Sequence, residues 1–207
     1  MLSRKSETDI TSWIHNSKTA LLVTGARQVG KTWSIRNCLQ NEGCNYLEIN
    51  LIEEPELVPA LAQCNSVNDL VVILSATKNY SFVKGKTILF IDEIQEYKEI
   101  VTRIKFWVDE GSYRYILSGS LLGVELKRLR SAPVGYLSEI RMFPLDFEEF
   151  LLASGVTSET LHYLRSCFKK CKAVEEIIHQ KMMKHFQRYL VVGGLPAAVQ
   201  EYVNSGD

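Results

Sequence analysis

The sequence predicts an α/β fold in which a parallel sheet is covered by helices and is followed by a small helical unit. Short apolar segments alternate with helix-compatible segments up to Met142, and a glycine-bearing turn joins the first strand to the first of these helices. The alternation stops after Pro144, and the remaining pattern is helical. Strands connected by helices run parallel. We therefore expect two domains, residues 1–145 and residues 146–207.

Each expected element follows from its local pattern. Five β-capable apolar runs bounded by polar or turn residues predict strands at 20–24, 46–51, 87–91, 113–117 and 136–142. Helices are expected between them at 31–40, 69–76, 97–108 and 121–129. The second domain should contain helices at 147–153, 159–190 and 197–204. Because the last of these has barely begun when the sequence stops, we expect the chain to be truncated.

Composition and charge exclude several classes of protein. The 207 residues are 46% hydrophobic and 23% charged, which excludes a disordered or low-complexity chain. The 24 basic residues balance the 24 acidic ones, so no overall field attracts nucleic acid or an acidic membrane. No apolar run approaches the roughly 18 residues of a membrane span, and no signal segment is visible. We expect a cytoplasmic protein with no membrane partner.

The cysteines and one cluster of basic residues are interpreted as structural rather than functional. Five cysteines, an odd number without a C-x-x-C pair, indicate neither a disulfide framework nor a zinc site. Cys167 and Cys171 share an apolar helix face, which predicts that both are buried; its other members are Leu164, Phe168, Val174, Ile178 and Met182. Glutamates interrupt a basic cluster that we interpret as a solvated helix face rather than a nucleic-acid patch: Arg165, Lys169, Lys170, Lys172, Lys181 and Lys184.

A phosphate-binding motif lies between the first strand and its helix. Residues 25–32 read G-x-x-x-x-G-K-T, the P-loop pattern in the strand-to-helix setting that such a loop requires. Small residues let backbone N–H groups surround phosphate oxygens, Lys31 reaches the terminal phosphates, and Thr32 offers a hydroxyl to Mg²⁺. The residues expected to contact the nucleotide are Gly25, Ala26, Arg27, Gln28, Val29, Gly30, Lys31, Thr32 and Trp33.

Two adjacent carboxylates end the apolar strand at 87–91. Asp92 is expected to hold Mg²⁺ together with Thr32, and Glu93 to orient and deprotonate the water that attacks the γ-phosphate. A solvated acidic pair at a strand end is the alternative, but the P-loop in the same chain favours the metal and catalytic roles. The sequence thus predicts a nucleotide hydrolysis site that uses Mg²⁺.

Hydroxyl side chains follow the strand at 113–117. Ser118 or Ser120 could sense the γ-phosphate or place the attacking water. A serine at the end of a strand is also a common helix cap, and a helix is expected from Leu121. Both interpretations remain open from the residues alone.

Several segments of the chain resemble those of the prokaryotic AAA-type P-loop ATPases. The resemblance rests on residues 25–32, 90–95 (F-I-D-E-I-Q), 117–120 (L-S-G-S), 142–150 (M-F-P-L-D-F-E-E-F) and 189–196 (Y-L-V-V-G-G-L-P). It implies an AAA-type P-loop core with a small helical lid and ATP as the nucleotide. It also implies Walker A at 25–32, Walker B at Asp92 with Glu93 catalytic, and a sensor hydroxyl at Ser118 or Ser120.

The resemblance further implies partners and an additional cation. Such proteins continue into a C-terminal domain, which could contact DNA or a protein client and which this sequence lacks. AAA proteins place an arginine finger at the end of the helix after the sensor strand, where this chain has Arg128 and Arg130, and a finger acting between subunits would imply a homo-oligomer. Cations favoured by a helix C-terminus are the alternative for these two arginines.

These observations together predict Mg²⁺-dependent ATP binding and hydrolysis. No Asn-Lys-x-Asp motif and no Leu-Ser-Gly-Gly-Gln motif occurs, which argues against a GTPase and a transporter-type ATPase. Two other functions remain open. The module could be a nucleotide-operated switch with negligible hydrolysis, or it could drive a DNA-associated effector whose activity resides in the absent domain.

Overall fold

The computed structural model of the chain describes residues 2–120 and 135–206. The chain divides into two compact units. One is Ser6–Met142, and the other combines the described parts of Met1–Lys5 and Phe143–Asp207. The first contains the sheet and the second is helical, so the change in sequence pattern after Met142 coincides with a change in architecture.

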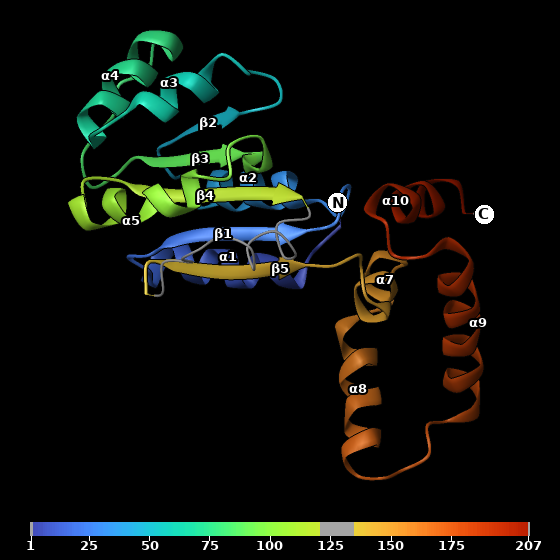
Figure 1. The fold of residues 1–207 in the computed structure, drawn as a ribbon. Helices are drawn as coiled ribbons and strands as arrows, with labels where there is room; N and C mark the ends of the chain where they lie inside the picture. Colours follow the sequence, from blue (N-terminus) through green and yellow to red (C-terminus); the bar gives the residue numbers. More distant parts are fainter. Residues whose placement is uncertain (1, 121–134, 207) are drawn as a thin grey trace. The chain divides into compact units, whose positions relative to one another are not determined.

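A five-stranded parallel sheet forms the first unit, and all its arrows point the same way in Figure 1. The strand order is β2-β3-β4-β1-β5. The bounds are β1 Ala20–Gly25, β2 Tyr46–Asn50, β3 Ile88–Asp92, β4 Arg114–Ser120 and β5 Leu137–Met142. The predicted α/β fold is confirmed, and β4 runs further than expected, to Ser120. Because β4 lies between β1 and β3, its end separates the P-loop from Asp92.

Alternation along the strands gives the sheet two apolar faces. Leu21 and Val23 of β1 belong to one core with α1 Lys5–Asn16 and α2 Lys31–Asn41, while Leu22 belongs to the other. That second core includes α3 Leu57–Gln63, α4 Val67–Lys78 and α5 Ile100–Glu110. Burial on both sides explains why the three inner strands β1, β3 and β4 are mostly apolar, whereas the edge strands β2 and β5 alternate with polar residues.

The helices of this unit differ from the prediction in three places. The pattern did not predict α1 or α3. The helix expected from Tyr97 begins at Ile100, and a 3₁₀ turn, η1 Ile94–Glu96, precedes it. The helix expected at 121–129 lies outside the described residues, as do Arg128 and Arg130.

The second unit consists of α7 Phe147–Ala153, α8 Ser158–Lys169, α9 Glu176–Val192 and α10 Pro196–Ser205. The single helix predicted over 159–190 is therefore wrong. The break includes Cys171, whose backbone is left-handed with φ 51°. Cys167 is buried as predicted, but Cys171 is exposed and Phe168 is 86% exposed, because the broken helix cannot keep one continuous face toward a core. In the described part of the chain, no helix combines the length and apolar character needed to cross a bilayer.

Two of the segments that carry the family resemblance meet in this unit. The Leu145 N–H donates to the Gly194 carbonyl at 2.7 Å, and the Tyr189 hydroxyl donates to the Leu145 carbonyl at 2.8 Å. A Cβ at Gly194 would lie 2.3 Å from the Leu145 carbonyl oxygen. Glycine is therefore required at position 194 by close backbone packing, and the two segments form one structural contact.

Candidate nucleotide-binding site

The P-loop connects β1 to α2 through unusual backbone conformations. Gly25 has φ 157°, and a Cβ there would lie 2.3 Å from the Met142 carbonyl oxygen. Gln28 has φ 64°, and Gly30, the N-cap of α2, has φ 92°. The N-cap residue Gly30 has no side chain, and no side-chain capping bond is present at this helix end among the described residues. The first N–H groups of the helix are thus left for an anion, as phosphate binding at a helix N-terminus requires.

Lys31 places its ammonium inside the P-loop. The side chain is only 6% exposed, and Nζ donates to the carbonyls of Gly25 at 3.2 Å and Ala26 at 2.8 Å. It also donates to Ser120 Oγ at 3.2 Å. Burial lowers the pKa of Lys31, and Glu93 and Asp92 oppose that shift only in part. A phosphate would supply the charge that these neutral partners lack.

Asp92 joins three elements at the carboxyl edge of the sheet. The side chain is 2% exposed, and Oδ2 accepts from Thr32 Oγ1 of α2 at 2.6 Å. Oδ1 accepts from the Ser118 hydroxyl of β4 and from the Glu93 N–H, the latter at 2.9 Å. The structure therefore brings Thr32 and Asp92 together, as predicted, and places the hydroxyl of Ser118 on the same carboxylate.

The donor set formed by Thr32 and Asp92 fits a magnesium ion. A hydroxyl and a carboxylate are hard oxygen ligands, which Mg²⁺ prefers. No group of three His, Cys, Asp or Glu side chains among the described residues could hold a metal alone. This agrees with Mg²⁺ sites of nucleotide enzymes, where one or two protein ligands are completed by phosphate oxygens and water.

Glu93 lies next to Asp92 in a strained conformation. Its backbone is left-handed, with φ 57°, and its carboxylate accepts from Gln95 Nε2 at 2.5 Å. Gln95 in turn accepts from the Ser120 N–H at 3.1 Å. Gln95 belongs to the segment 90–95 that carries the family resemblance, but no role was predicted for it. Its place in the short turn η1 after the strand could have indicated one.

The remaining predicted nucleotide-binding residues differ in exposure. Ala26, Arg27 and Trp33 are exposed, whereas Val29 is buried in the core beneath the loop. Trp33 is 42% exposed on the first turn of α2. No contact of this tryptophan in the structure tests its predicted role, which stays a prediction.

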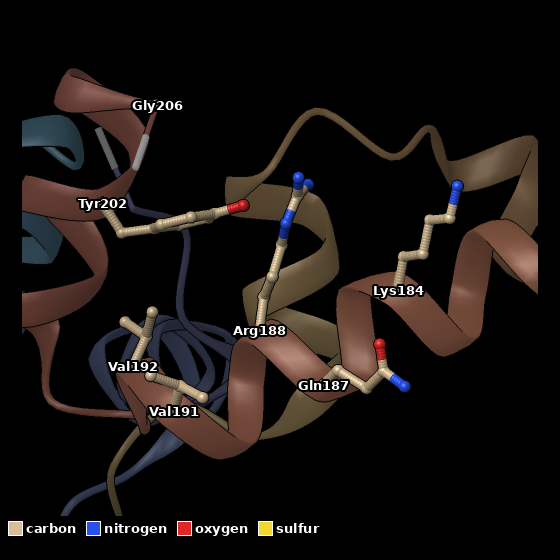
Figure 2. A pocket seen from close by; sticks show the side chains of 7 residues that line it. All are labelled: Lys184, Gln187, Arg188, Val191, Val192, Tyr202 and Gly206. Carbon is tan, nitrogen blue, oxygen red and sulfur yellow. The ribbon is translucent and has the colours of Figure 1, made fainter.

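A pocket of about 470 Å³ lies within the helical unit. It is lined by Lys184, Gln187, Arg188, Val191, Val192, Tyr202 and Gly206. Figure 2 shows Lys184 and Arg188 extending from α9, with the Tyr202 hydroxyl directed toward Arg188. None of the described residues that line the pocket carries a carboxylate that could act as a general base. The edge of the sheet is therefore the better candidate for nucleotide chemistry.

Over residues 17–151 the sequence matches the family described as the AAA domain. The chain belongs to this family. A search of curated proteins finds no match. The predicted resemblance to AAA-type P-loop ATPases is confirmed, and membership in the AAA domain family makes this a nucleotide-binding chain.

Solved structures resemble this AAA chain at low sequence identity. The Walker-type ATPase paby2304 of Pyrococcus abyssi matches with a TM-score of 0.56 and 18% identity, over 100% of this chain and 69% of that one. The Orc1 protein of Aeropyrum pernix in complex with DNA gives 0.45 and 14%, over 72% and 47%. A RuvB variant of Thermotoga maritima gives 0.44 and 16%, over 78% and 50%. The first likeness establishes the P-loop fold and nothing finer.

Proposed function

We propose that this AAA domain binds ATP with Mg²⁺ and hydrolyses it. The observation that carries the proposal is the 2.6 Å contact between Thr32 and Asp92, formed beside the buried ammonium of Lys31. Three side chains from α2 and β3 thus converge where a phosphate and its metal would have to lie. The adjacent carboxylate of Glu93 adds a base to this group.

Each residue has a defined part in the proposed reaction. The P-loop N–H groups and Lys31 hold the phosphates, while Thr32 and Asp92 hold the metal. Bound Mg²⁺ would neutralise charge on the β- and γ-phosphate oxygens. Glu93 accepts a proton from the water whose oxygen forms a bond to the γ-phosphorus as the bond to the ADP oxygen breaks. Ser118 holds the Asp92 carboxylate in place through its hydroxyl.

Glu93→Gln tests hydrolysis directly. The amide keeps the shape of the side chain but cannot take a proton, so we expect ATP turnover to fall by about 10²-fold or more. Binding of ATP, measured as a rise in melting temperature, should persist. Glu96→Gln, an exposed glutamate in the adjoining turn, is the matched control and should retain turnover. Full turnover by Glu93→Gln would sink the catalytic assignment and favour the nucleotide-operated switch.

We propose that the chain forms a homo-oligomer when it hydrolyses ATP. An arginine finger contributes about 10³ to 10⁵ in rate when it reaches the γ-phosphate. If Arg128 or Arg130 acts from a neighbouring subunit, specific activity should rise with protein concentration, and Arg128→Ala or Arg130→Ala should lose turnover while still binding ATP. Concentration-independent activity that tolerates both changes would argue for a monomer. A DNA or protein client remains a further proposal.

A further inference from the structure

Gln95 connects Glu93, the proposed base, to the end of strand β4. Its Nε2 donates to Glu93 Oε2 at 2.5 Å, and its Oε1 accepts from the Ser120 N–H at 3.1 Å. The two bonds use the two ends of one terminal amide. The side chain therefore bridges a carboxylate at the end of β3 to the backbone at the end of β4.

The chemistry of the two partners fixes the orientation of this amide. A backbone N–H can only donate, so the atom facing Ser120 must be the carbonyl oxygen of Gln95. An ionised carboxylate can only accept, so the atom facing Glu93 must be the amide nitrogen. Both requirements are met at once, which no other side chain of this length would achieve. Glutamate could accept from Ser120 but could not donate to Glu93.

Ser120 also touches the phosphate-binding cation. Its hydroxyl accepts from Lys31 Nζ at 3.2 Å, and its N–H is the group held by Gln95. A continuous hydrogen-bonded chain therefore runs from Lys31 through Ser120 and Gln95 to Glu93. Ser120 is 4% exposed, so bulk water does not replace these partners freely.

We propose that Gln95 is a positioning residue that holds the Glu93 carboxylate in register with Ser120 and links its placement to the phosphate-binding Lys31. The role rests on the proposed function of Glu93 as the base. A phosphate that draws the Lys31 ammonium changes the contact at Ser120, and Gln95 transmits that change to the carboxylate. The base is then aligned when a phosphate is present to be attacked.

Steady-state kinetics of the full chain test the role in turnover. Gln95→Ala removes both bonds, and a supporting residue of this kind is worth about 10- to 100-fold, so kcat should fall by that factor while KM for ATP stays within about twofold. Gln95→Glu keeps an acceptor for Ser120 but repels Glu93, and its kcat should fall at least as far. The matched control is Gln180→Ala, which removes a Gln–Glu amide–carboxylate bond of 2.7 Å within α9 and should leave both constants unchanged.

Amide hydrogen exchange tests the bridge without any turnover. The Ser120 N–H should exchange slowly in the wild-type chain and in Gln95→Glu, and at least tenfold faster in Gln95→Ala. Addition of ATP with Mg²⁺ to the Glu93→Gln chain should change the exchange rate at Ser120, because Lys31 is then drawn toward phosphate. The Gln180→Ala control should exchange as the wild type does.

The outcomes separate the bridge from the proposed function. A wild-type chain that hydrolyses ATP while Gln95→Ala or Gln95→Glu retains full kcat overturns the positioning role and leaves the function intact. If Gln95→Ala loses kcat with a matching change in KM and a lower melting temperature, Gln95 only stabilises the fold, and this result also overturns the positioning role. If the wild-type chain has no turnover, the proposed function fails, and an unaltered Ser120 exchange rate in Gln95→Ala would overturn the bridge independently.

Discussion

Each compact unit buries a cation and a carboxylate, but the two sets are built differently. In the helical unit Arg4 Nε donates to Glu149 Oε1 at 3.2 Å, and both side chains are about 5% exposed. Glu149 also accepts from the backbone N–H groups of Lys5 at 2.8 Å and Asp146 at 3.0 Å, and Arg4 donates to the Phe143 carbonyl at 2.6 Å. This ion pair has its partners within the fold.

Lys31 and Asp92 in the P-loop unit are buried without pairing with each other. Lys31 donates to two backbone carbonyls and a hydroxyl, and Asp92 accepts from two hydroxyls and an N–H. Neither makes an ion pair with any residue that the structure describes. The difference shows that burial of charge alone does not indicate function. A buried charge left with neutral partners points to a charged ligand, whereas a fully paired one points to structure.

Arg4→Met should give the largest effect on stability. It leaves the Glu149 carboxylate buried without its cation, which costs about 3 to 5 kcal/mol in the free energy of unfolding. Amide exchange in α7 measures this locally, since the chain has two compact units. Lys5→Met is the control, because its contacts with Asp146 and Glu148 are half exposed and worth at most about 1 kcal/mol each. Equal losses of stability in Arg4→Met and Lys5→Met would contradict the assignment of the Arg4–Glu149 pair as a structural ion pair.

Lys31→Met should behave in the opposite way. ATP with Mg²⁺ at a hundredfold excess over its dissociation constant stabilises the wild-type chain by about 2.7 kcal/mol, and the variant should lose that shift. Without nucleotide the variant should be at least as stable as the wild type, because it no longer buries an ammonium among neutral partners. Melting temperatures with and without ATP measure both effects. A nucleotide-free variant as destabilised as Arg4→Met would show that Lys31 is structural.

The pH dependence of stability should also show that the Lys31 ammonium is buried without a charged partner. Burial lowers its pKa below 10.5, so in the folded state it loses its proton at a lower pH than in the unfolded chain. Between the two pKa values the unfolded chain binds more protons, and stability therefore rises with pH. In denaturant unfolding, the free energy of unfolding of the wild type should rise relative to that of Lys31→Met as the pH rises toward 10.5. A constant difference between the two chains would contradict the buried, unneutralised ammonium.

Much of the fold was predictable because local patterns specify it. The inner strands β1, β3 and β4 are mostly apolar and buried on both faces. A phosphate-binding motif lies at the end of β1, and a pair of carboxylates lies at the end of β3. Sequence alone therefore located Lys31, Thr32 and Asp92, and the structure brings all three together. Gly194 was marked by the family resemblance, and its role became clear only from its contact with Leu145.

What could not be predicted depends on contacts between distant residues or on weak local signals. Arg4 and Glu149 are 145 residues apart, and nothing in either segment indicates the other. The two hydrogen bonds of Gln95 join the ends of β3 and β4, and this pairing is not visible from the sequence around Gln95. At the break between α8 and α9, the residue with left-handed backbone is Cys171. Glycine or asparagine at this position would have indicated the end of the helix in the sequence. The periodicity of apolar residues therefore ran through it.

Gln28→Gly should give the smallest effect and tests whether strain in the P-loop serves function. Gln28 is exposed with φ 64°, a conformation that costs an ordinary residue about 1 to 2 kcal/mol. Glycine removes that cost but adds about 0.5 to 1 kcal/mol of unfolded-state entropy, so the net gain in stability should be at most about 1.5 kcal/mol. Because the loop uses backbone N–H groups, the ATP-induced shift in melting temperature should survive. Gly25→Ala, which drives a Cβ into the Met142 carbonyl at 2.3 Å, should instead destabilise the loop and weaken ATP binding. A loss of the ATP shift in Gln28→Gly would show that the glutamine side chain itself contacts the nucleotide.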